Sequence, residues 1–380
     1  MVKGFTLIRM NVLNFRFIYL TVFFAILFYS VHCRQSPERL VNKAENALKD
    51  QNSVRALIFF QKAFEASLPS DYFPTDRNEE YDDMVLSESR EYLLLSENNK
   101  GRYHSKFTVV NLKEKDYWEK KLAGYIIYSA ISPGGRYSIF LLEYEEKKCT
   151  ISIWDIQARQ DLPFNAEAMC QHKPGISDDG KLIFLENDTI KSFNVATLEK
   201  SIETKIDVSQ STFEKFPAAA WFQFSPDNSL FYTYGYAGEY RLYWLYNQKS
   251  KLITKSGATG RIYFRYNNND PGIITGGADT HRITFFLKDE YNEELKNLKV
   301  SYWRDASFIN DQFYYYIEEG RLGMSLDGQD KTLDFWAQKI YLGMDKEAYI
   351  ISPLKHLLVY RGKELPIQAR EIFQRGWDIQ

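Results

Sequence analysis

Short runs of apolar and aromatic residues, separated by polar turns, fill the chain from about residue 84 to its end. Three of the turns resemble one another and begin at Ser132, Ser177 and Ser225, as in Ser132-Pro133-Gly134-Gly135. They start 45 and 48 residues apart, and a weaker copy starts at Ser87, 45 residues before the first. A repeating unit of about 40 to 45 residues cannot bury its own faces and must stack on its neighbours. The pattern therefore predicts consecutive four-stranded units.

A helical pattern precedes the strands. Apolar residues follow helical spacing on both sides of a polar break at residues 50–53, namely Leu40, Ala44, Ala47, Leu48, Ala56, Phe59, Phe60, Ala63 and Phe64. This spacing predicts a helical hairpin over residues 37–67. Residues 68–83 contain two prolines and a cluster of acidic side chains, and we expect them to form a linker.

The first 33 residues are predicted to be a signal peptide or membrane anchor. Residues 15–31 are mostly apolar, with Arg16 as the single charged residue, and the cationic residues Lys3 and Arg9 precede them. The stretch is slightly shorter than the ~20 residues that a spanning helix needs. Met1 and Met10 are both possible starts. In either case we expect residues 34–380 to lie outside the cytoplasm.

Cys33 follows the apolar stretch directly and precedes the polar residues 34–37. A cysteine at this point resembles the lipid-modified cysteine of bacterial lipoproteins. The resemblance implies lipidation of Cys33 and an exported protein anchored to a membrane of the bacterial cell envelope, on the periplasmic side or at the cell surface. Ser30 and His32 depart from the family motif, which has Leu and a small residue at these places. An uncleaved signal anchor and simple secretion therefore stay open.

The repeated turns and the dipeptide Trp154-Asp155 resemble those of WD-repeat and related bacterial propeller families. The resemblance implies a mainly β fold, with a closed WD-repeat-like β-propeller of about seven four-stranded blades over residues 84–380. Six or eight blades are alternatives. Within residues 37–67, Ala44, Ala56 and Phe60 resemble one tetratricopeptide unit, which is not stable alone and must pack on the propeller or on another protein.

Cys149 and Cys170 are predicted to form a disulfide, because export places them in an oxidising compartment. Both lie in strand-like runs, and the midpoint between them falls at Arg159-Gln160, in the connecting turn. An antiparallel hairpin with that symmetry puts the two cysteines directly opposite each other. The alternative is a pair of small buried thiols.

Charge and aromatic content narrow the possible partners. The 48 Lys and Arg nearly balance the 50 Asp and Glu, and no basic stripe is present, so we expect no nucleic-acid partner. Aromatic side chains are densest around Trp221, Tyr234 and Tyr236. Packing between blades is the favoured explanation of these rings. The alternative is a platform that binds a ligand such as a glycan by stacking.

No catalytic residue, metal site or cofactor is predicted. The sequence contains no Gly-x-Ser-x-Gly or His-Glu-x-x-His motif. The acidic pair Asp178-Asp179 lies in one of the repeated turns, where we expect both side chains to be solvated.

Two functions follow from the sequence. The first is a non-enzymatic scaffold, tethered to the envelope, that binds other envelope proteins through the propeller faces and the helical hairpin. The alternative is an enzyme or a small-ligand or glycan receptor with its site in the central channel.

Overall fold

The computed structural model describes residues 35–380 with internal gaps. The backbone is described for residues 35–77, 79–99, 104–145, 148–164, 166–170, 172–186, 189–195, 197, 199–205, 220–224, 228, 230–237, 240–247, 252–259, 262–267, 270–276, 281–285, 296–298, 303–308 and 313–380. Side chains are described over most of 35–184 and 313–380, and at few positions between. The predicted signal or anchor segment, including Cys33, lies outside these residues. None of the described helices has the length and apolar character that crossing a membrane requires.

The chain divides into two compact units. One comprises Met1–Pro69 together with Leu365–Gln380, and the other is Ser70–Glu364. The described part of the first unit is helical, with α2 (Pro37–Lys49), α3 (Ser53–Ser67) and α4 (Ile367–Trp377). Both ends of the described chain therefore belong to the same unit.

Helices α2 and α3 form the predicted hairpin. Each begins at a polar cap: the Ser36 Oγ accepts a hydrogen bond from the Arg39 N–H at 3.3 Å, and the Asn52 Oδ1 accepts from the Arg55 N–H at 3.0 Å. Small residues make the close approach of the helices possible, since Ala44, Ala56 and Ala63 are fully buried. These alanines include the positions that carry the resemblance to a tetratricopeptide unit.

Helix α4 corrects the prediction that the propeller extends to residue 380. It packs on α3, with the rings of Phe64 and Phe373 6.1 Å apart and Trp377 stacked on Phe373. Arg375 forms an ion pair with Glu45 of α2. The helix buries Ala369, Ile372, Phe373 and Gly376, whose spacing of three and four residues marks one helical face. It supplies the packing partner that the isolated hairpin needs.

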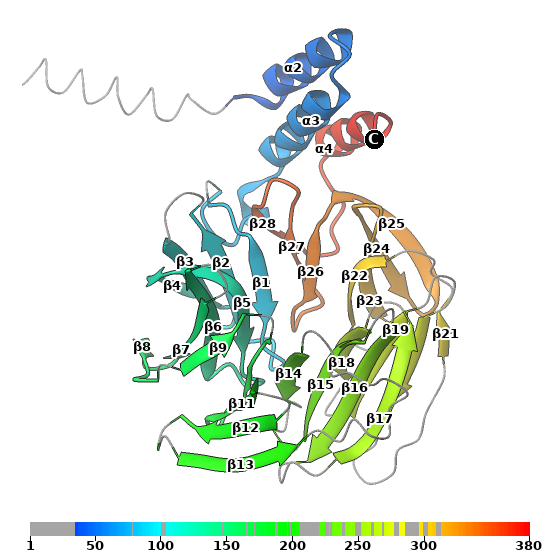
Figure 1. The fold of residues 1–380 in the computed structure, drawn as a ribbon. Coiled ribbons are helices and arrows are strands. Elements are labelled where there is room, and N and C mark those ends of the chain that lie inside the picture. The colour runs from blue at the N-terminus through cyan, green and yellow to red at the C-terminus, as the bar shows by residue number, and fades with distance from the viewer. Residues whose placement is uncertain are drawn as a thin grey trace, which may run out of the picture. The chain divides into compact units, whose positions relative to one another are not determined.

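The strands of the second unit form antiparallel sheets of consecutive strands (Figure 1). The first sheet contains β1 (Asp83–Leu86), β2 (Tyr92–Asn98), β3 (His104–Asn111) and β4 (Asp116–Ala123). The second contains β5 (Tyr125–Ile131), β6 (Tyr137–Glu145), β7 (Lys148–Asp155), β8 (Gln160–Asp161) and β9 (Ala166–Met169). The third contains β10 (Gly175–Ile176), β11 (Lys181–Glu186), β12 (Thr189–Asn194) and β13 (Glu199–Lys205).

The later sheets continue this order. The fourth contains β14 (Ala220–Phe224), β15 (Leu230–Ala237), β16 (Tyr240–Asn247) and β17 (Leu252–Thr259). The fifth contains β18 (Ile262–Asn267), β19 (Asp270–Gly276), β20 (His281–Phe285) and β21 (Lys296–Leu298). The sixth contains β22 (Trp303–Phe308), β23 (Phe313–Glu318), β24 (Arg321–Leu326) and β25 (Gln329–Trp336). The last described sheet contains β26 (Lys339–Leu342), β27 (Ala348–Ile351) and β28 (Leu357–Tyr360).

The first strands of successive sheets lie next to one another around an axis. Contacts join β1 to β5, β5 to β10, β10 to β14, β18 to β22 and β22 to β26, and β26 returns to β1. The first and last sheets share an apolar cluster that includes Met84, Leu93, Ile351 and Val359. This cluster joins the two ends of the series of sheets. Each described sheet consists of strands that are consecutive in the chain.

The last sheet has three described strands, whereas the repeat predicts four. The short 3₁₀ turn Ser70–Tyr72 lies beside β28, Tyr72 is buried, and the Arg361 guanidinium donates a hydrogen bond to the Asp71 carbonyl. Farther along, the Tyr81 N–H donates to the Lys355 carbonyl at 2.7 Å. The segment that we expected to be a linker is therefore packed against the last sheet, and its buried tyrosines explain why.

The repeated turn has a common geometry in the first three sheets. In Ser132–Gly135, the Gly135 N–H donates to the Ser132 carbonyl at 2.8 Å, and the Ser132 Oγ accepts from the Tyr137 N–H at 3.0 Å. The same hydrogen bonds occur around Ser87. At Ser177 the turn is one residue shorter, and the Ser177 Oγ accepts from the Lys181 N–H. The fourth residue of the turn has a positive φ, which is 82° at Gly135. This conformation favours glycine at that place.

Replacing Gly135 with alanine is expected to lower the free energy of unfolding by about 1–3 kcal/mol. A Cβ atom there would lie 2.2 Å from the Tyr92 ring, in addition to the cost of the positive φ. Gly328→Ala is the matched control, since its φ is also positive, at 77°, but a Cβ meets nothing within 4 Å. Urea unfolding of both variants measures the difference. Equal losses would show that the ring does not restrict this turn.

Candidate functional site at the turn face of the propeller

The repeated turns of neighbouring sheets are hydrogen-bonded to one another. The Ser89 N–H donates to the Pro133 carbonyl at 2.8 Å, and the Gly134 N–H donates to the Asp178 Oδ2 at 2.8 Å. Two hydrogen bonds of 3.0 Å join Asp178 to Asn228: the Asp178 N–H donates to the Asn228 Oδ1, and the Asn228 Nδ2 donates to the Asp178 Oδ2. Turns of the first four sheets are linked in order by these contacts. We call the surface built by these turns, and by the turns between third and fourth strands, the turn face.

The turns between third and fourth strands attach to the same face. We call the turn between the third and fourth strands the outer turn, and the turn between the first and second strands the inner turn. In each of the first three sheets, a backbone N–H of the outer turn donates to a carbonyl of the inner turn. The pairs are Leu112 to Glu91, Ile156 to Arg136 and Val195 to Gly180. Neighbouring outer turns also pair, since the Arg159 guanidinium lies 2.6 Å from the Asp116 carboxylate. The turn face is therefore a continuous, polar and hydrogen-bonded surface across these sheets.

A contact between two sheets that are not neighbours crosses the inner side of this face. The Gln223 Nε2, on the first strand of the fourth sheet, donates to the Glu88 Oε1, on the first turn of the first sheet, at 2.9 Å. Side chains from separate sheets thus meet near the axis. At this point, the hydrogen bond between Gln223 and Glu88 covers part of the area near the axis, so the central channel is not fully open here.

Asp178 is hydrogen-bonded to the turns of both neighbouring sheets. The sequence predicts a solvated side chain here, and the structure instead shows one that is engaged in hydrogen bonds. It is only partly exposed and accepts two hydrogen bonds on one oxygen. The sequence indicates the turn in which it lies, but the partners Gly134 and Asn228 are 44 and 50 residues away. Only the stacking of sheets brings these residues together.

Asp178→Ala is expected to lower the free energy of unfolding by about 1–3 kcal/mol, because it leaves the Gly134 N–H and the Asn228 amide without their acceptor. Asp161→Ala, at an exposed position in β8, is the control and should change it by less than about 0.5 kcal/mol. Urea unfolding measures both. A loss at Asp178 no larger than that at Asp161 would contradict the role of this carboxylate as a link.

A groove of about 650 Å³ lies at the opposite end of the first sheet's strands. It is lined by Glu97, Asn99, His104, Ser105, Lys106, Glu119, Lys121, Leu122 and Ala123. The Lys106 Nζ lies 3.0 Å from Glu79, 3.2 Å from Glu119 and 3.3 Å from Glu97. Burial acts to lower the pKa of Lys106, but hydrogen bonds and charge from these carboxylates outweigh it and raise the pKa. The groove thus holds a fixed ion-pair network.

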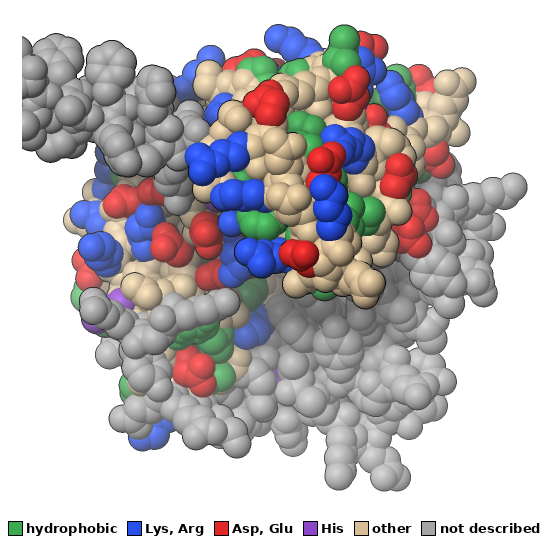
Figure 2. Space-filling view, turned by 90° about the horizontal axis from the view of Figure 1, so that it is seen from above, with side chains coloured by type: hydrophobic (Ala, Val, Ile, Leu, Met, Phe, Trp, Pro, Cys, Tyr) green, Lys and Arg blue, Asp and Glu red, His purple; other side chains and the backbone are tan. Residues whose placement is uncertain are grey.

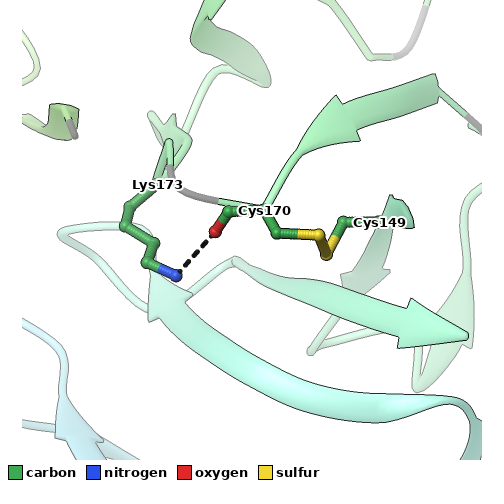
Figure 3. Close-up of a disulfide and its surroundings, with 3 residues drawn as sticks. All are labelled: Cys149, Cys170 and Lys173. Carbon is green, nitrogen blue, oxygen red and sulfur yellow. Dashed lines mark hydrogen bonds between the residues drawn. A yellow bond between two sulfur atoms is a disulfide. The ribbon is translucent and has the colours of Figure 1, made fainter. Parts of the chain in front are cut away.

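Cys149 and Cys170 form a disulfide with their Cα atoms 5.3 Å apart, which lies in the usual range (Figure 3). The register differs from the predicted one, because β7 pairs Cys149 with Ala168. The turn at Leu162–Phe164 interrupts the hairpin between β8 and β9 and adds two residues on that side. An offset of two residues keeps both cysteines on one face of the sheet, so the sulfurs still meet diagonally.

Lys173 lies beside the disulfide. Its Nζ donates to the Cys170 carbonyl at 3.1 Å, as Figure 3 shows, and lies 5.6 Å from the centre of the Tyr128 ring. Burial lowers the pKa of this amine. The Lys173 carbonyl accepts a hydrogen bond from the Phe222 N–H at 3.0 Å, which connects this segment to β14.

The other predicted site residues are not placed by side chain. Trp221 lies in β14, and Tyr234 and Tyr236 lie in β15, with Trp221 paired to Tyr234 in the backbone register. Their side chains, like the whole of Cys33, lie outside the described part of the chain. Within that part, no group of three or more His, Cys, Asp or Glu has the arrangement of a metal site.

Comparison with known proteins identifies the fold. No protein-family model and no curated protein sequence matches the chain. Among solved structures, a chain of the mitotic checkpoint complex superposes with a TM-score of 0.52 at 10% identity, covering 78% of this chain and 96% of the other. The β-propeller domain of the Trilobed protease from Pyrococcus furiosus superposes with a TM-score of 0.50 at 14% identity, covering 75% and 96%.

A chain of hydrazine synthase from Kuenenia stuttgartiensis gives a TM-score of 0.50 at 12% identity, covering 76% of this chain and 96% of the other. At these identities the likeness shows the fold alone. The second unit is a β-propeller, and the predicted mainly β fold is confirmed.

Proposed function

We propose that this chain is a non-enzymatic interaction protein, tethered to a membrane of the bacterial cell envelope, that binds other envelope proteins through the turn face of a seven-bladed propeller. The described strands supply seven consecutive sheets, of which the last contains three described strands. The tether is a lipid on Cys33 or, where the leader is not cleaved, the apolar stretch at residues 15–31. The described domains then lie on the outer side of the membrane.

The interlocking of the turns carries the proposal. Turns from four sheets are hydrogen-bonded into one surface, and the contact between Glu88 and Gln223 closes part of the area near the axis. A preformed surface loses little conformational entropy on binding, which favours recognition of another protein. A site for a small substrate would need a concave pocket with converging polar groups, and in the groove beside Lys106 the amine and the carboxylates are paired with one another.

Charged residues around the rim offer a direct test. Lys113 and Lys115 are exposed in the turn between β3 and β4, on the turn face. Full-length protein with an affinity tag is cross-linked in membranes and purified, and cross-links are mapped by mass spectrometry. We expect a stoichiometric partner with cross-links to the turn face. Reversing Lys113 and Lys115 to Glu should lower its recovery at least about tenfold.

Lys148→Glu is the matched control, because Lys148 is exposed at the other end of the strands, where β7 begins. It should leave recovery unchanged. The proposal fails if no stoichiometric partner is recovered, or if cross-links map elsewhere and both variants recover the partner equally.

A further inference from the structure

The hairpin of α2 and α3 has one surface that combines cations with exposed apolar groups. We call it the basic face and define it by Arg39, Lys43, Arg55, Ile58, Phe59 and Lys62. Arg39 and Lys43 are four residues apart on α2, and Arg55, Phe59 and Lys62 follow helical spacing on α3. Each set therefore lies along one side of its helix.

Contacts around Phe59 show that the two helices contribute to the same surface. The Lys43 Nζ lies 5.8 Å from the centre of the Phe59 ring, and the Arg55 guanidinium carbon lies 5.6 Å from it. Ile58, which precedes Phe59 in the sequence, is 41% exposed, and Val54, one helical turn earlier, is 74% exposed. Cations and apolar side chains are thus interspersed around Phe59. Figure 2 shows Lys and Arg, Asp and Glu, and hydrophobic side chains mixed on the surface turned to the viewer.

The acidic residues of α2 contact helix α4 and not the side chains of the basic face. Glu45 forms an ion pair with Arg375, and the Glu38 carboxylate accepts a hydrogen bond from Gln368 at 2.6 Å. Both partners belong to α4, which contacts α3 at the rings of Phe60 and Phe64, and neither of these residues belongs to the basic face. The separation leaves the cations of the basic face without a facing carboxylate from α2.

The chain enters the hairpin at this same face. The Lys43 Nζ donates to the side-chain carbonyl of Gln35 at 2.8 Å, so the residue that precedes the cap of α2 lies beside the basic face. In the sequence, the apolar stretch ends at residue 31, only four residues before Gln35. An extended chain of four residues spans at most about 14 Å. A membrane that holds the apolar stretch must therefore lie close to the basic face.

We propose that the basic face binds the surface of the bilayer that holds the N-terminal segment, through anionic lipid headgroups. Cations near an anionic surface are attracted to it, and partly exposed Phe, Ile and Val side chains enter the boundary between headgroups and acyl chains. The inference rests on the proposed membrane tether. Contact with the bilayer fixes the orientation of the helical unit at the membrane.

Amide hydrogen exchange of the full-length protein tests this contact. The protein is reconstituted into vesicles of phosphatidylcholine alone, or of phosphatidylcholine with phosphatidylglycerol. We expect the amides of residues 53–62 to exchange at least about tenfold more slowly with phosphatidylglycerol present, and high salt should reverse the effect because it screens headgroup charge. The amides of α4 should exchange equally in both.

A pair of matched variants provides the control. Arg39→Glu with Lys62→Glu reverses two exposed charges on the basic face, and Lys49→Glu with Arg370→Glu reverses two exposed charges elsewhere on the unit. Only the first pair should abolish the slower exchange. Equal exchange in the two kinds of vesicle, or protection that survives the first pair, overturns the inference. Failure of the protein to float with vesicles of either kind would instead overturn the membrane tether.

Discussion

Ending the chain after Glu364 is expected to unfold α2 and α3. The truncation removes α4, which contributes buried Ala369, Ile372 and Phe373 to the helical unit. Two helices of 13 and 15 residues bury too little apolar surface to be stable alone in water. We expect amide exchange of residues 37–67 to approach the rate of an unfolded peptide. The described strands of the other unit should keep their protection.

A point variant gives the same test without truncation. Phe373→Ala leaves a cavity beside Phe64 and should lower the free energy of unfolding of the helical unit by about 3–5 kcal/mol. Arg370→Ala, on the exposed side of α4, should have little effect. If α2 and α3 stay protected after either the truncation or Phe373→Ala, then α4 is not what completes the hairpin.

Loss of the disulfide is expected to lower the free energy of unfolding of the propeller by about 3 kcal/mol. Cys149 and Cys170 are 21 residues apart, and in the chain-entropy description a bridge of this length restricts the unfolded chain by about that amount. The bridge fastens β9 and the following segment to β7, next to the contact between Lys173 and β14. Urea unfolding with and without reductant measures the effect.

The double variant Cys149→Ser with Cys170→Ser separates the bond from other effects of the reductant. It should unfold at the midpoint of the reduced native protein, and reductant should not change it further. A native protein whose midpoint is the same with and without reductant would show that the bridge does not stabilise this region.

Local sequence signals predicted those elements whose cause is local. The repeated turns that begin with serine predict the strands on either side of them. Each turn needs a serine acceptor and a residue of positive φ, as at Ser132 and Gly135, and both requirements are visible in the sequence. The hairpin follows from small residues at the helix contact, such as Ala44 and Ala56. The strand repeat does not predict helix α4, although Ala369 and Phe373 have helical spacing.

Contacts between distant segments could not be predicted in this way. Asp178 meets Gly134 and Asn228 only because three sheets stack, and the single sequence has no signal for that pairing. Similarly, the disulfide register depends on two residues added near Pro163, which a symmetric hairpin does not include. The proposed ligand positions Trp221, Tyr234 and Tyr236 stay predictions.

Gln35 and Gln380 belong to one helical unit, and this determines how a force applied between these two residues would act. A pull applied between Gln35 and Gln380 acts first on the packing of α4 against α3, since all three helices belong to the unit that contains both residues. The sheets between Ser70 and Glu364 are bypassed until that packing breaks. Under such a force, the packing between α3 and α4 therefore has to break before the sheets of the propeller bear any load.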